Sequence, residues 1–176
     1  VYIADKNNHR IRMVAKASGT YFGQSMTANS IYSLGTGFLN PRGVNVDAGG
    51  HVYVSDSDNN RVQFIPKSNG TYFGRALTAN TAHTIVGNGS SVATADSVMA
   101  TTARLSSGGG ASGVAVDPAG NIYIADTFNN RIRFVPKVGG SYFGQTMTAN
   151  AIYTIAGNGT AGYVADNVAA TNTRIN

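Results

Sequence analysis

The sequence repeats itself three times, and this repetition constrains the fold more than any other feature. The segment VYIAD at residues 1–5 returns as VYVSD at 52–56 and as IYIAD at 122–126. Residues 52–106 align with residues 122–176 without a gap, and about half of the aligned positions are identical. Chains of this kind fold by stacking one supersecondary unit on the next, so the content of the repeat predicts the architecture.

Each complete unit contains four short segments in which apolar residues alternate with polar or small ones, the period of a pleated strand. In the second unit they are 43–47, 51–55, 61–66 and 82–86; in the third they are 113–117, 121–125, 131–136 and 152–156. Turn-forming residues separate them, as in Ala48-Gly49-Gly50. Four short antiparallel strands per unit predict the blades of an all-β propeller.

We treat residues 1–176 as a single propeller segment with units at 1–51, 52–121 and 122–176. The first unit is shorter because it lacks the stretch that follows GNG at 87–89 and at 157–159. Insertions in repeat arrays fall in loops, so we predict a loop there. The first unit opens at a second strand, which gives eleven strands and a partial propeller of about two and three-quarter blades, consistent with half of a six-bladed ring.

Both ends of such a segment would present unpaired strand edges, and edges of this kind invite pairing with another chain. We therefore expect the chain to be a piece of a longer protein, or to self-associate through its open blade edges. A head-to-tail pair of copies would complete a ring.

The repeat carries a recognisable pattern. The segment NPRGVNVD at 40–47, followed by GHVYVSD at 50–56 and NNRV at 59–62, resembles the NHL repeat. The segment GVAVDPAGNIYIADTFNNRIRFV at 113–135 is a closer match. The resemblance extends over nearly the whole chain, and it implies four-stranded NHL-type blades, which in that family build propellers that often have six blades.

Three residues of the strand–turn–strand segment recur with fixed spacing: an Asp, an Asn three residues later and an Arg five residues later. They are Asp5, Asn8 and Arg10; Asp56, Asn59 and Arg61; and Asp126, Asn129 and Arg131. Asp and Asn side chains cap tight turns by bonding nearby backbone N–H groups. The family resemblance implies that the Arg ties the turn or a neighbouring blade. Ligand binding is the alternative, but three equivalent copies favour a structural role.

A second recurring set is an aromatic pair in the long connection between the third and fourth strands of each unit. Its members are Tyr21, Phe22, Tyr72, Phe73, Tyr142 and Phe143. One interpretation makes them a binding surface for a sugar or a protein. The other, which we favour, is that they pack the connection onto the blade.

The sequence predicts no catalytic, cofactor-binding or metal-binding site. The chain has no Cys, and its three histidines, His9, His51 and His83, fall at three different repeat positions without metal-ligand spacing. All eight carboxylates are Asp, and all except Asp58 occupy repeated positions. A pair of groups placed for acid–base catalysis would instead be expected to break the repeat. Enzyme activity is therefore disfavoured.

These observations favour a non-catalytic binding scaffold whose loops on one propeller face meet a protein or carbohydrate partner. The alternatives are a propeller-type lyase whose site lies in missing blades, a self-assembling structural protein and an RNA-binding NHL module. The net charge of +5 suits nucleic acid, but most arginines recur at repeat positions, so nucleic acid is disfavoured. No apolar run has the length of a membrane span. Low charge, Thr and Asn richness and the absence of Cys favour a secreted or extracellular protein.

Overall fold

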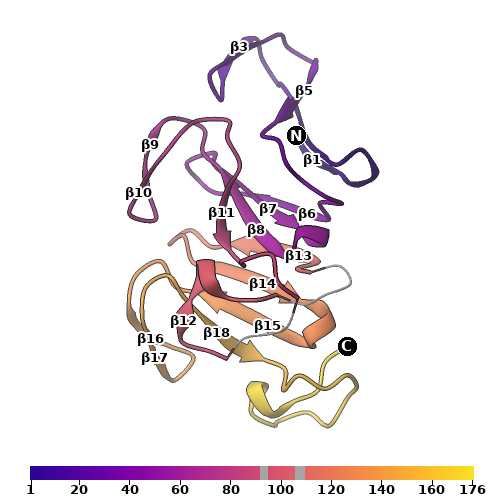
Figure 1. Cartoon of the computed structure of the whole chain (residues 1–176), viewed down its shortest axis with the longest axis vertical. Helices are drawn as coiled ribbons and strands as arrows, with labels where there is room; N and C mark the ends of the chain where they lie inside the picture. The colour runs from indigo at the N-terminus through magenta and orange to yellow at the C-terminus, as the bar shows by residue number, and fades with distance from the viewer. Residues whose placement is uncertain (92–94, 106–109) are drawn as a thin grey trace.

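Three antiparallel sheets follow one another along the chain in the computed structural model, which describes residues 1–91, 95–105 and 110–176. Blade 1 is formed by β1 (Tyr2–Asp5), β2 (Arg10–Val14) and β5 (Ile31–Leu34). Blade 2 is formed by β6 (Gly43–Val46), β7 (Val52–Asp56), β8 (Arg61–Ile65) and β11 (His83–Val86). Blade 3 is formed by β13 (Gly113–Val116), β14 (Ile122–Asp126), β15 (Arg131–Val135) and β18 (Ala151–Ala156). The sheets lie one beside the next from the N-terminus to the C-terminus (Figure 1).

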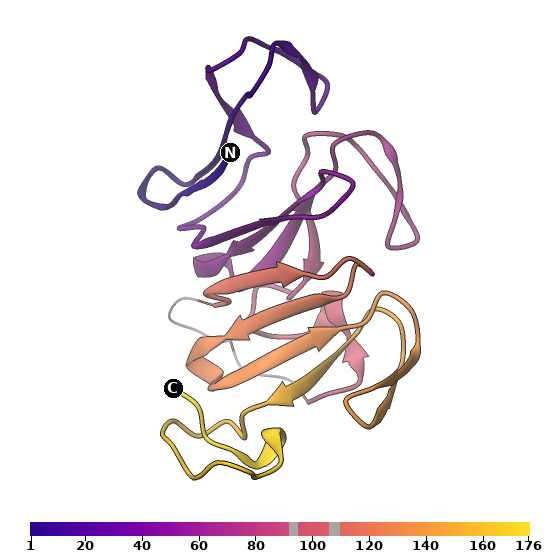
Figure 2. The ribbon, with the colours of Figure 1, turned by 180° about the vertical axis from the view of Figure 1, so that it is seen from behind.

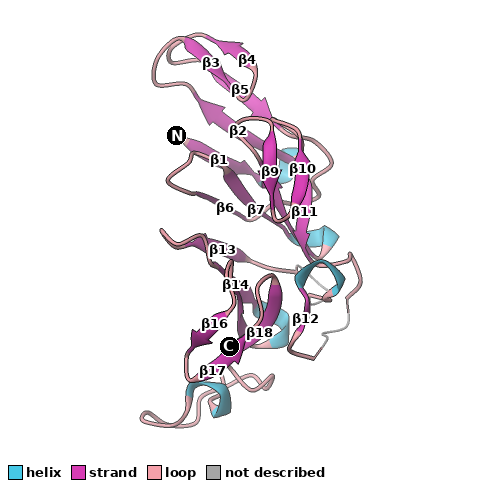
Figure 3. Cartoon of the chain, turned by 90° about the vertical axis from the view of Figure 1, so that its left-hand side faces the viewer, coloured by secondary structure: helices cyan, strands magenta, loops and turns pink. Residues whose placement is uncertain are grey.

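This arrangement is an all-β partial propeller with NHL-type blades. In blades 2 and 3 each strand pairs with the next blade strand along the chain, in the spatial orders β11-β8-β7-β6 and β18-β15-β14-β13. The eleven predicted blade strands are all present, and the ends of the eight strands in blades 2 and 3 differ from the predicted ones by at most one residue. Helical structure among the described residues is confined to short 3₁₀ turns (Figure 3), and none of those helices has the length and apolar character to cross a membrane.

The core lies between the blades, because each middle strand sends alternate side chains to opposite faces. Val52 and Val54 of β7 pack in one cluster with Ile11 of blade 1. Tyr53, between them, packs in a second cluster with Ile124 of blade 3. All five residues of β7 are buried, because sheets cover both faces of blade 2.

The strand–turn–strand segments close through nearly identical turns. The 3₁₀ turns η1 (Lys6–Asn8), η2 (Ser57–Asn59) and η4 (Thr127–Asn129) end at His9, Asn60 and Asn130, whose φ angles are 54°, 52° and 51°. Asn is among the few residues that adopt this left-handed conformation readily. The turn in blade 2 also meets Gly87, where a Cβ atom would clash with the carbonyl oxygen of Asn60, so only glycine fits there.

The connection between the third and fourth blade strands is a β-hairpin in every unit, whereas the sequence predicted a longer connection there without strands. The hairpins are β3 (Gly19–Tyr21) with β4 (Gln24–Met26), β9 (Gly70–Tyr72) with β10 (Arg75–Leu77), and β16 (Gly140–Tyr142) with β17 (Gln145–Met147). The hairpins β9–β10 and β16–β17 project from the same side of the blades, as Figure 2 shows from behind.

The stretch after GNG in the second unit, which was predicted to be a loop, contains a short strand and a 3₁₀ turn. Residues Val98–Met99 form β12, which pairs with β18 and gives blade 3 a fifth strand at its outer edge. The turn η3 (Ala100–Thr102) follows. Residues 92–94 of this stretch lie outside the described residues. The stretch therefore connects blades 2 and 3 and also joins the sheet of blade 3.

We expect Ile124→Ala to lower the free energy of unfolding by about 3 kcal/mol, because the fully buried Ile124 fills the space between blades 2 and 3. Urea unfolding followed by circular dichroism measures this. The control Val138→Ala, at a side chain that is 65% exposed, should change the value by less than about 0.5 kcal/mol. Equal effects of the two substitutions would contradict a shared core between the blades.

Candidate functional site

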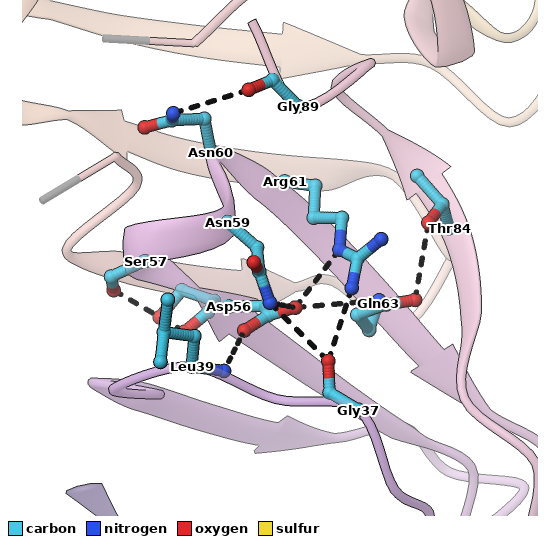
Figure 4. Close-up of polar contacts among 11 residues, drawn as sticks. Gly37, Leu39, Asp56, Ser57, Asn59, Asn60, Arg61, Gln63, Thr84 and Gly89 are labelled. Carbon is cyan, nitrogen blue, oxygen red and sulfur yellow. Dashed lines mark hydrogen bonds and ion pairs between the residues drawn. The ribbon is translucent and has the colours of Figure 1, made fainter. Parts of the chain in front are cut away.

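The recurring Asp of blade 2 is a buried hydrogen-bonding centre. Asp56 has no exposed surface, and its carboxylate accepts hydrogen bonds from the Leu39 N–H (2.7 Å), from Asn59 Nδ2 (2.9 Å) and from Arg61 Nε (2.9 Å). Arg61 Nη2 also donates to the carbonyl oxygen of Gly37 (3.1 Å). Leu39 and Gly37 belong to the connection that arrives from blade 1, so this network ties two blades together (Figure 4).

The equivalent carboxylates of blades 1 and 3 form ion pairs with a different arginine. Asp5 pairs with Arg12 (3.4 Å) and Asp126 pairs with Arg133 (3.5 Å), two residues beyond the recurring Arg. The Asn three residues after each Asp donates to it in both blades, as Asn59 does in blade 2. The structure thus brings each Asp together with its Asn, and in blade 2 also with the Arg five residues later.

The aromatic pairs sit at the tips of the hairpins. The two-residue turns Phe22-Gly23, Phe73-Gly74 and Phe143-Gly144 have positive φ at both positions, the geometry of a type I′ turn. A bulky residue with positive φ is uncommon, and it occurs here three times. Phe22 is buried, Phe73 packs edge-on against Phe64, and Phe143 is 58% exposed although it lies edge-on to Phe134.

A cleft of about 350 Å³ opens where the β9–β10 hairpin faces blade 3. Blade 2 supplies an aromatic wall of His51, Phe64 and Tyr72. The centre of the Tyr72 ring lies 4.7 Å from that of His51 and 5.3 Å from that of Phe64. Blade 3 supplies the opposite side through Gly120, Lys137 and Asn150. The cleft exists only because two blades adjoin.

The polar rim of the cleft is held in place by a turn. Asp47 accepts hydrogen bonds from the His51 N–H (2.9 Å) and from the Tyr53 hydroxyl (3.2 Å). Burial raises the pKa of Tyr53 well above its usual value, and the nearby Asp47 charge raises it further. Tyr53 therefore stays protonated as a hydrogen-bond donor. The exposed Lys137 also lines the cleft, from blade 3, so the lining includes residues of both signs of charge.

The histidines are not brought together. His9 Nδ1 accepts from the Asn40 N–H (3.1 Å), His51 Nδ1 accepts from the Lys67 N–H (3.1 Å), and His83 Nε2 contacts the Thr78 carbonyl oxygen (3.3 Å). Over the ranges 1–91, 95–105 and 110–176, no group of three His, Cys, Asp or Glu side chains could hold a metal ion.

Of the residues that line the cleft, Tyr72 and Phe73 were candidates from the sequence, whereas His51, Phe64 and Lys137 were not. The missing information is which side chains face each other across two blades. The recurrence of Tyr53 and Phe64 as Tyr123 and Phe134 was the available signal for an aromatic wall.

A comparison with protein families matches the NHL repeat at residues 38–63 and 109–133. The first match covers β6, β7 and the start of β8, and the second covers β13, β14 and the start of β15. No curated protein matches the chain.

We expect Asp56→Ala to lower the free energy of unfolding by about 3–5 kcal/mol, because it leaves buried donors of two blades without their acceptor. The matched control is Asp5→Ala, at the same repeat position, where the Asp side chain is 25% exposed. Its cost should stay below about 1 kcal/mol. Chemical denaturation of the two variants gives the comparison, and a larger loss for Asp5→Ala would contradict the assigned role of Asp56.

Asp117 directly follows β13, in the turn equivalent to that of Asp47. Burial alone raises the pKa of Asp117, but hydrogen bonds from Asn121, Tyr123 and Gly120 outweigh it and leave the pKa below the usual value. A carboxylate whose pKa is lowered by folding stabilises the fold above its unfolded pKa of about 3.9, and this contribution disappears as the pH falls through the folded pKa.

The wild-type protein should therefore be more stable than Asp117→Asn at pH 7, and the difference should shrink below about pH 4. Unfolding free energies measured from pH 2.5 to pH 7 test this. A difference that stays constant over that range would contradict the assigned hydrogen bonds.

Proposed function

The chain belongs to the NHL-repeat family, and on that premise we propose that it is a non-catalytic scaffold that binds a segment of a partner protein in the cleft between blades 2 and 3. NHL repeats generally mediate protein interactions. The observation that carries the proposal is the aromatic wall of Phe64, Tyr72 and His51, set beside a rim that holds both an Asp and a Lys. Aromatic anchors inside a polar rim are the usual composition of protein-binding sites.

The shape of the cleft favours a peptide segment. Its volume of about 350 Å³ is at the small end of ligand sites and accommodates a few side chains. Asp47 and Lys137 can bind oppositely charged groups of the partner, and Tyr72 and Phe73 can stack on apolar side chains. Because the walls come from two rigid sheets, binding requires little ordering of the scaffold, which favours affinity.

The test begins with a displayed random-peptide library selected on the purified chain. For a selected peptide, we expect Tyr72→Ala to weaken binding about 30-fold, as measured by calorimetry, because Tyr72 is an aromatic anchor of the wall. The matched control is Tyr142→Ala at the same repeat position of blade 3. There, no further blade among the described residues completes a cleft, so affinity should not change.

The proposal would be contradicted if Tyr72→Ala left the affinity for the selected peptides unchanged. It would also be contradicted if Tyr142→Ala reduced that affinity as much as Tyr72→Ala does. An oligosaccharide array probed with the same proteins provides the other arm. Glycan binding that depends on Tyr72, in the absence of any peptide that does, would assign the cleft to carbohydrate. Unfolding midpoints of both variants show whether a loss of binding reflects a loss of structure.

A further inference from the structure

The connection between blades 2 and 3 reaches across to the outer edge of blade 3 and is fixed there by one carboxylate. Val98 and Met99 of β12 pair with Ile152 and Ala151 of β18. Asp96, just before β12, accepts hydrogen bonds from the Thr154 N–H (2.9 Å) and hydroxyl (2.9 Å) and from Arg133 Nη2 (3.0 Å). Ile152 is fully buried.

The residue at the position of Arg133 differs according to the connection that reaches its blade. In blade 3, Arg133 is fully buried between Asp96 (3.0 Å) and Asp126 (3.5 Å). Blade 2 receives the short connection, which lacks an Asp96 equivalent, and there the position is Gln63, which accepts a hydrogen bond from the Thr84 hydroxyl (3.3 Å). Of these two blades, the one whose incoming connection carries the carboxylate has the arginine, and the other has a glutamine.

Residues 157–173 form a second connection, whose described features match those of the first at both of its ends. The Gly157 N–H donates to the Ala170 carbonyl (2.9 Å), as the Gly87 N–H does to that of Ala100 (2.9 Å). Asn167 has φ 62°, and its counterpart Ser97 has φ 67°.

In this second connection the residues equivalent to Asp96, Val98 and Met99 are Asp166, Val168 and Ala169. All three are exposed, and Asp166 accepts a hydrogen bond from the Tyr163 hydroxyl (3.3 Å). The segment is shaped as the first connection is, but no strand of the described chain pairs with it.

Blade 1 presents the complementary edge. It carries Arg12 at the position of Arg133, and this side chain is 24% exposed, whereas Arg133 has no exposed surface. Ser33 stands at the position of Thr154. Ile31, equivalent to the buried Ile152, is 48% exposed, and β5 is the outermost strand of its sheet within the described ranges.

We propose that residues 166–169 of one copy of this chain add as an outer strand to β5 of a second copy, with Asp166 bound to Arg12 and Ser33. The blade 3 edge provides the template: the donor has the backbone of the first connection, and the acceptor has an arginine where blade 2 has a glutamine. Such a contact joins different surfaces of the two copies, so the association is head-to-tail. The preformed backbone of the donor lowers the cost of ordering it.

Cysteine cross-linking tests this directly, because the chain has no cysteine of its own. Met99 faces Ala151 in the template, and the equivalent positions are Ala169 in the donor and Ser30 in the acceptor. Directly opposed residues of antiparallel strands lie within the Cα separation that a disulfide spans. Mixing Ala169→Cys protein with Ser30→Cys protein under mild oxidation should give a disulfide-linked heterodimer on a non-reducing gel.

Two controls decide whether the contact is specific. Thr81→Cys is at the same repeat position of blade 2, where Gln63 replaces the arginine, and it should cross-link to Ala169→Cys at background level. Adding Asp166→Asn, at an exposed site that leaves the fold intact, should weaken association of the unlinked chains about tenfold in sedimentation experiments, because it removes a charge-assisted hydrogen bond.

Equal cross-linking at Ser30→Cys and Thr81→Cys would overturn the proposal. So would association that is unchanged by Asp166→Asn, or a chain that remains monomeric at every concentration. Peptide binding in the cleft plays no part in these readouts, so this proposal and the proposed function can fail separately.

Discussion

The middle sheet of this chain is apolar on both faces, and the rest of the structure depends on the mutual burial that follows. Val52 and Val54 require blade 1, and Tyr53 on the opposite face requires blade 3. A four-stranded blade cannot bury these side chains alone, so the stable object is a row of sheets. The polar network of Asp56 serves the same end, because it fixes the connection that brings one sheet to the next.

The blade strands could be predicted from the sequence because their signal is local. The alternation of apolar residues and the turn residues between them located all eight strands of blades 2 and 3, and the repeat gave the remaining three of blade 1 by their number. The hairpins were not predicted because the residues at their tips are Phe-Gly, whereas the usual sequence signal of a two-residue hairpin turn is Asn-Gly or Asp-Gly. Phe73 adopts the left-handed conformation because its ring packs on Phe64, a contact that sequence spacing does not reveal.

The cleft was beyond sequence analysis for a related reason. Tyr72 and His51 belong to blade 2 and Lys137 to blade 3, so their proximity depends on how two sheets pack. Repetition also conceals such a site, because every unit carries the Tyr-Phe pair of the hairpin, while the cleft is lined by the pair of blade 2. Phe73 is partly buried against the core between blades 2 and 3, whereas Phe143, at the same repeat position, is exposed. A neighbouring blade therefore changes the burial of one repeated residue.

Arg133 and the carboxylate that holds it belong to different repeat units, since Asp96 lies in the second unit and Arg133 in the third. Deleting the second unit would therefore bring the short connection of the first unit, which has no such carboxylate, to Arg133, and leave a buried arginine with one counter-charge fewer. The second and third units thus form a matched pair whose order is set by electrostatics, although their blades are alike in shape.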